Sequence, residues 1–71
     1  MHIHVFKTNI STLEKRNAVQ SLLNSHHAII KWNIDKWDDD NILRIEALHE
    51  NSNEFIHCIG EAGFDIQLLE D

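Results

Sequence analysis

The order in which two hydrophobic periods follow one another constrains the fold of this chain more than any other feature. Four short segments alternate apolar with polar residues, which is typical of half-buried strands. Two longer segments repeat apolar residues at helical spacing. The strand segments cover residues 1–6, 30–34, 43–47 and 64–68, and the helical segments cover residues 11–25 and 51–63. The predicted order is therefore β-α-β-β-α-β.

Local signals predict where the two helices begin and end. Ser11 stands three residues before Glu14, the spacing of a capping box, so we expect Ser11 to cap the first helix. Asn51 is expected to open the second helix and Gly63 to end it. The apolar stripes of the two helices consist of Leu13, Val19, Leu22 and Leu23, and of Phe55, Ile59 and Ala62.

This element order is that of the split βαβ, or ferredoxin-like, motif. Right-handed crossovers then give an antiparallel sheet of strand order 4-1-3-2, with both helices on one face. The fold class is α+β, and 71 residues suffice for one hydrophobic core. We therefore predict a single domain over residues 1–71.

The chain resembles the heavy-metal-associated domain family, which includes small copper chaperones and the soluble modules of metal-transporting ATPases. A strand leads into I-S-T-L-E-K, where the family has M-T-C-x-x-C, and an apolar pair follows at Val19 and Leu23. The segment I-I-K-W-N-I-D matches the family's second strand. The segment F-I-H-C-I-G-E-A-G-F-D matches its second helix, which ends in a glycine and an aromatic residue. The resemblance covers nearly the whole chain.

The resemblance fails at the family's metal loop. Aligned from Val19 and Leu23, the family's Met, Thr and two Cys positions are occupied by Ile10, Ser11, Thr12 and Lys15. Cu(I) needs soft thiolate or thioether ligands, and an ammonium group has no free electron pair. Metal transfer is therefore not expected here. We expect Ile10 to fill the core, and Lys15 with Arg16 to offer a basic contact surface.

Six histidines offer a different metal chemistry. The predicted topology brings the start of the first strand, the end of the first helix and the end of the third strand to one edge. We expect His2, His26, His27 and His49 to lie at that edge, opposite the metal loop, with His4 further in. Neutral imidazoles suit Zn, Ni or Cu(II). The alternative is a set of exposed histidines without a common geometry.

Composition indicates which partners and which cellular location to expect. A net charge of -6 argues against nucleic acid, because phosphate recognition rewards clustered Lys and Arg. The apolar runs are too short for membrane insertion, and the N-terminus does not resemble a signal peptide. The single cysteine, Cys58, cannot form an intramolecular disulfide, which favours a reducing, cytoplasmic location.

These features predict a small non-catalytic domain that has no cofactor and acts by contact with another protein or with its own copy. The sheet face without helices and the edge strands are the surfaces available for such contact. The alternative is a chaperone, buffer or sensor that binds Zn, Ni or Cu through histidines. A redox role of Cys58 is a third alternative. No nucleophile with a base and an orienting group is apparent, so an enzyme is not expected.

Overall fold

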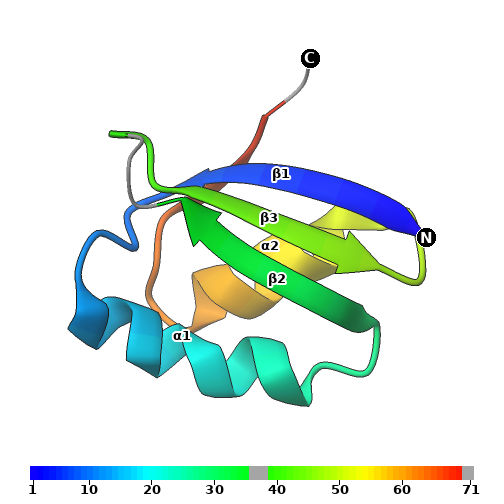
Figure 1. Cartoon of the computed structure of the whole chain (residues 1–71), viewed down its shortest axis with the longest axis horizontal. Helices are drawn as coiled ribbons and strands as arrows, with labels where there is room; N and C mark the ends of the chain where they lie inside the picture. Colours follow the sequence, from blue (N-terminus) through cyan, green and yellow to red (C-terminus); the bar gives the residue numbers. More distant parts are fainter. Residues whose placement is uncertain (36–38, 70–71) are drawn as a thin grey trace.

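The computed structural model describes residues 1–35 and 39–69. Its elements are β1 (His2–Thr8), α1 (Leu13–Ser25), β2 (Ile29–Asp35), β3 (Ile42–Ala47), α2 (Ser52–Glu61) and β4 (Ile66–Leu68). The four strands form one antiparallel sheet of order β2-β3-β1-β4, and both helices lie on the same face of it (Figure 1). The predicted fold class, element order and strand order are confirmed.

The register of the sheet decides which strand residues face the helices. In β1 the inward residues include His4 and Phe6, which pair with Ile45 and Leu43 of β3. Ile3 lies on the opposite face and is 55% exposed. The inner face of β1 therefore carries His4 and Phe6, whereas Ile3, which is more apolar than His4, lies on the outer face.

The core lies between the sheet and the two helices. Phe6 and Phe55 meet edge to face, with ring centroids 6.5 Å apart. The buried apolar residues of the described chain are Phe6, Ile10, Val19, Leu23, Ala28, Ile34, Leu43, Ile45, Ala47, Phe55 and Ile59. Trp32 packs against this core while half-buried, and its indole Nε1 donates to Asn24 Oδ1 at 2.7 Å.

The first helix begins one residue later than predicted, and Ser11 is not its cap. Thr12 is the N-cap, with its backbone extended and its Oγ1 accepting the backbone N–H of Lys15 at 3.1 Å. Leu13, predicted to belong to the apolar stripe, is 64% exposed. It stands six residues before Val19, which places it roughly 120° around the helix from that buried side chain.

The second helix ends as predicted, at a glycine. Gly63 has a φ of 95°, in the left-handed region that L side chains rarely adopt. Its N–H donates to Gly60 O at 3.0 Å, and the N–H of Phe64 donates to Ile59 O at 3.4 Å. These two bonds cap the helix end. Phe64 precedes the short β4 and does not belong to it, and Ala62 is exposed.

Two further observations complete the fold. Between β2 and β3 the sequence of residues 38–41 is polar, as expected of a turn, and Trp37 precedes it. Asp39 and Asp40 form a turn, whereas Trp37 and Asp38 lie outside the described residues. Neither α1 nor α2, the helices of the described residues, has the length and apolar character needed to cross a bilayer.

Candidate functional site

The loop that enters α1 is held by local hydrogen bonds. Ile10 is 3% exposed and fills the core. Its backbone N–H donates to Thr8 Oγ1 at 3.2 Å, and the same hydroxyl donates to the carbonyl of Asn41 at 2.7 Å. The hydroxyl thus joins the end of β1 to the residue before β3, which positions the loop.

Both side chains at the expected cysteine positions have intramolecular partners. The Thr12 hydroxyl caps α1, as described above. The Lys15 ammonium donates to the backbone carbonyl of Asn9 at 3.3 Å, which folds the side chain back over the loop. Neither group is a soft donor, so these two positions offer hydrogen bonds and a positive charge rather than thiolates.

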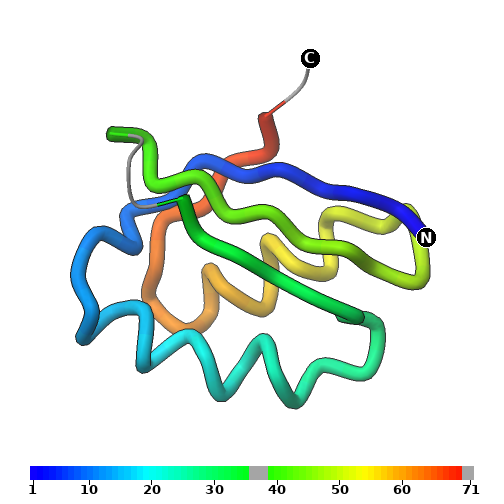
Figure 2. Tube along the Cα trace, in the orientation of Figure 1, coloured from blue at the N-terminus to red at the C-terminus, as the bar shows by residue number. Residues whose placement is uncertain are grey.

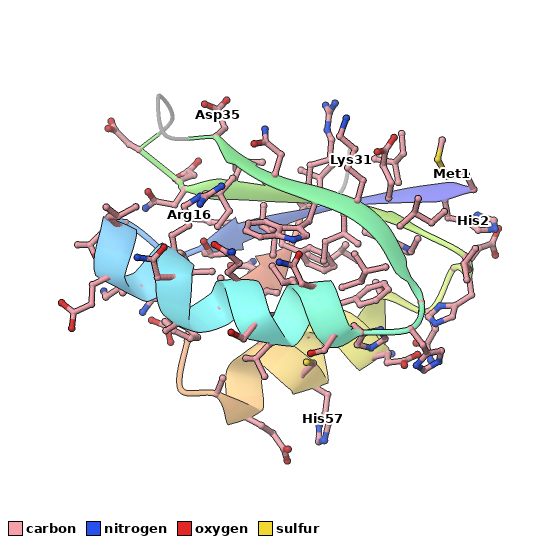
Figure 3. The ribbon with its side chains drawn as sticks, turned by 60° about the horizontal axis from the view of Figure 1, so that its bottom comes forward. Met1, His2, Arg16, Lys31, Asp35 and His57 are labelled. Atoms are coloured by element: carbon pink, nitrogen blue, oxygen red, sulfur yellow. The ribbon has the colours of Figure 1, made fainter. Side chains whose placement is uncertain are left out.

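The two residues of the predicted basic surface, Lys15 and Arg16, also form contacts within the chain. The Arg16 guanidinium lies 5.1 Å from the centroid of the Trp32 ring, a cation–π contact between α1 and β2. Figure 3 shows Arg16 between that helix and the sheet. Lys15 and Arg16 are both half-buried. They contribute positive charge to this end of the domain without extending freely from it.

The opposite end of the domain gathers the chain segments that carry histidines. The end of α1, the end of β3, the start of α2 and the N-terminus lie at the same edge of the molecule (Figure 2). His26 is the C-cap residue of α1 and His49 follows β3. Glu54 stands in the first turn of α2.

At this edge one carboxylate contacts two imidazoles. Glu54 Oε1 lies 3.1 Å from His26 Nε2, and Glu54 Oε2 lies 2.8 Å from His49 Nε2. The His27 ring stacks on the His26 ring, with centroids 5.1 Å apart and planes 12° apart. One ligand atom each from His26, His27 and Glu54 lies within 4.8 Å of the others. We call His26, His27, His49 and Glu54 the histidine–glutamate cluster.

A buried aromatic ring supports the cluster. Phe55 is fully buried beside Glu54, and its centroid lies 5.3 Å from that of His26 and 5.5 Å from that of His49. His4 contacts the same ring at 5.3 Å and donates from Nε2 to the carbonyl of His49 at 2.9 Å. His4 thus acts beneath the cluster and orients the His49 backbone.

Backbone groups determine which ring nitrogen of each imidazole carries the proton. The N–H of Ala28 donates to His26 Nδ1 at 3.1 Å, and the N–H of Asn51 donates to His49 Nδ1 at 3.2 Å. Because each Nδ1 accepts, each neutral ring carries its proton on Nε2. His49 Nε2 is enclosed, and the carboxylate oxygen 2.8 Å away lies out of line for a hydrogen bond.

Three histidines lie outside the cluster: His4, which lies beneath it, and His2 and His57. Glu54 is the cluster residue that sequence reasoning missed. His2 Nδ1 approaches the exposed Glu50 at 3.5 Å, so the predicted edge set is only partly brought together. His57 pairs with Glu61 at 3.2 Å and points away from the sheet (Figure 3). Glu54 had a sequence signal, its position three residues after Asn51, but that signal indicates only a helix start.

The thiol of Cys58 on α2 is partly buried. Burial raises its pKa above the ordinary value, and the carboxylates of Glu54 and Glu61 raise it further. A raised pKa lowers the fraction of nucleophilic thiolate at neutral pH. This environment argues against the predicted alternative of a redox role.

Comparison with known proteins establishes the fold. No protein-family model and no curated protein matches the sequence. Among solved structures, the apo heavy-metal-associated domain of the copper chaperone for superoxide dismutase matches at 13% identity and a TM-score of 0.79. The match covers 96% of this chain and 66%, just under two thirds, of that one.

Two further solved structures match over almost their whole length. The Atx1–Cu(I)–Ccc2a complex matches at 16% identity and a TM-score of 0.83, and the yeast copper transporter domain Ccc2a at 18% and 0.78. Each match covers 100% of this chain and 99% of the other. At such identities the likeness concerns the fold alone, which is that of heavy-metal-associated domains.

Proposed function

We propose that this chain is a non-catalytic protein-contact domain of heavy-metal-associated fold that has no thiolate metal site. The observation that carries this proposal is that the side chains of the loop before α1 form hydrogen bonds within the chain. Thr12 Oγ1 accepts a backbone N–H and Lys15 Nζ donates to a backbone carbonyl, at the positions where the resemblance places two cysteines. A soft metal ion has no ligand there.

The sheet face opposite the helices supports a contact role. Four of the six exposed large apolar side chains in the described residues lie at one end of the sheet, where β1 and β2 begin and β3 ends: Met1, Ile3, Ile30 and Leu48. We call them the apolar patch; their exposed fractions range from 55% to 74%. Met1 and Lys31 project from the side of the sheet away from the helices (Figure 3). Clustered exposed apolar groups are typical of contact surfaces.

The partner that we propose is another protein. The solved Atx1–Cu(I)–Ccc2a complex has the same fold as this chain, which supports a protein partner for such domains. The side chains bordering the patch on the open face are of both signs, with Lys31 paired across the strands with Glu46. A mixed charged border selects a protein surface of complementary pattern rather than a polyanion.

Site-specific photo-crosslinking in the native cell tests the proposed contact. A photoreactive residue replaces Ile3 in the apolar patch, and a matched chain carries it at Gln20, which is exposed on α1. We expect a discrete adduct from the Ile3 position, identified by mass spectrometry, and none from the Gln20 position. An adduct of twice the chain mass identifies the partner as a second copy. Equal labelling from both positions, or none from either, contradicts the proposal.

A further inference from the structure

The histidine–glutamate cluster lies at the end of the domain opposite the loop before α1, and its function is independent of the proposed contact role. We infer that His26, His27 and Glu54, whose ligand atoms lie within 4.8 Å of one another, bind a Zn²⁺ ion, and that His49 moves in as the fourth ligand. Imidazole nitrogens and a carboxylate oxygen form a donor set that Zn²⁺ accepts, whereas Mg²⁺ and Ca²⁺ prefer all-oxygen ligands.

The donor atoms of His26 and Glu54 lie near the spacing of a tetrahedral site, whereas the His27 and His49 rings must move closer to complete it. Ligand atoms at zinc bond lengths of about 2.0–2.1 Å are separated by about 3.3–3.4 Å around a tetrahedral ion. The Glu54 oxygens lie 3.1 Å from His26 Nε2 and 2.8 Å from His49 Nε2. The His27 ligand atom lies within 4.8 Å of those of His26 and Glu54. His27 is exposed, so its ring is free to turn from the stack toward the ion.

An unsatisfied buried nitrogen is a second observation for the same site. His49 Nε2 is enclosed and has no aligned hydrogen bond, despite the nearby carboxylate oxygen. Buried polar atoms of folded proteins are nearly always satisfied by protein, water or ions, because an unpaired one is costly. In the tautomer that carries its proton on Nδ1, His49 Nε2 has a lone pair directed toward Glu54, which a bound cation would satisfy.

The surroundings favour binding in some respects and oppose it in others. Phe55 beneath the rings limits the positions that the imidazoles of His26 and His49 adopt. Both rings carry their proton on Nε2, and this proton must leave before the ion binds. In the metal-bound rings the proton moves to Nδ1, so Ala28 and Asn51 lose their acceptors. We therefore expect affinity below that of a structural zinc site.

Protons compete with the ion at this site, so binding weakens as the pH falls. The titratable groups that face the ligands come from each element around them. From β1 these are His2 and His4, and from the loop before α2 it is Glu50, which pairs with His2. From α2 it is Cys58, whose thiol interacts with the Glu54 carboxylate.

The test is titration of the full chain with Zn²⁺ alone, followed by calorimetry and X-ray absorption. Three variants each remove one ligand. His26→Asn keeps an oxygen that accepts the Ala28 N–H, Glu54→Gln keeps the shape of the side chain, and His27→Ala alters an exposed residue. His57→Ala is the matched control on α2, and Cys58→Ser excludes the thiol.

We expect one Zn²⁺ per chain with a nitrogen and oxygen shell and a raised melting temperature. Affinity should fall about tenfold or more in each ligand variant, and remain unchanged in His57→Ala and Cys58→Ser. Circular dichroism confirms that each variant is folded. Absence of saturable binding, equal binding by Mg²⁺, or binding unaffected by the three variants overturns the inference. None of these results alters the crosslinking outcome that tests the contact proposal.

Discussion

His4 donates a hydrogen bond from Nε2 to the backbone carbonyl of His49 at 2.9 Å, which joins the middle of β1 to the loop before α2. The ring is only 9% exposed and lies against Phe55. It therefore combines apolar packing with a hydrogen bond that an aliphatic residue in its place cannot make.

This relationship predicts a graded loss of stability at position 4. His4→Ala removes both the packing and the donor, and should lower the free energy of unfolding by about 2–4 kcal/mol. His4→Gln retains a donor at similar reach and should lose roughly half as much or less. Urea denaturation of the two variants measures the difference. Equal losses contradict a role for the hydrogen bond to His49.

The cap of α1 provides a second prediction. Thr12→Ala removes the acceptor of the Lys15 N–H and should lower the free energy of unfolding by about 1 kcal/mol. Ser11→Ala alters an exposed residue outside the cap and should change it by less than about 0.5 kcal/mol. The denaturation midpoints of the two variants show which residue caps the helix. A larger effect at Ser11 places the cap one residue earlier.

Replacement by alanine should have opposite effects on stability at Gly60, within α2, and at Gly63, just after it. Gly63 has a positive φ, so Gly63→Ala should destabilise the domain by about 1 kcal/mol, although the added Cβ meets no atom within 4 Å. Gly60 lies within the helix and also has open space, so Gly60→Ala should stabilise by about 0.5–1 kcal/mol. Thermal unfolding of both variants checks the signs, and a stabilising Gly63→Ala contradicts the cap.

Sequence periodicity predicts the fold because each element keeps one period over its whole length. Periodicity does not show which of two neighbouring residues caps a helix when both residue types are good N-caps. Ser11 and Thr12 are both good caps, and the burial of Ile10 together with its bond to Thr8 determines which one begins the helix. Likewise, both faces of β1 carry apolar groups, and the carbonyl of His49 provides the partner that lets His4 face inward.

The candidate site is predicted less completely than the fold. Topology alone places His26 and His49 at one edge, since they follow α1 and β3. The contacts of Glu54 with His26 and His49 depend on how the loops after α1 and β3 pack against Phe55, which no local sequence pattern predicts. His2 lies at the same edge but is directed to Glu50 instead.

The environment of Cys58 predicts a pH dependence. Its pKa is raised by burial, and further by Glu54 and Glu61, so alkylation by iodoacetamide should be slow at neutral pH and accelerate only above the pH range of an ordinary thiol. Because the unfolded thiol ionises first, the associated stability is complete below the unfolded pKa and is lost as pH rises through the folded one. Glu61→Gln should speed alkylation modestly. Rates equal to those of the urea-unfolded chain contradict this account.

The last prediction concerns the loop before α1. Thr12→Cys with Lys15→Cys places two thiols three residues apart at the helix start, on a scaffold that already buries Ile10. In a Cys58→Ser background these are the only thiols of the chain. We expect this variant to take Cu(I) from a competing chelator, whereas the parent chain takes none, because thiolates are the ligands that Cu(I) prefers.

A register-shifted pair makes the test specific. Ser11→Cys with Glu14→Cys keeps the same spacing but moves both thiols one residue toward the N-terminus, to two exposed positions. The first thiol then precedes the Thr12 cap, and a one-residue shift turns the second by about 100° around the helix. Cu(I) binding should therefore be weaker in this control than in the Thr12 and Lys15 pair. Equal Cu(I) capture by the two variants shows that flexible thiols suffice and removes the support for the aligned register.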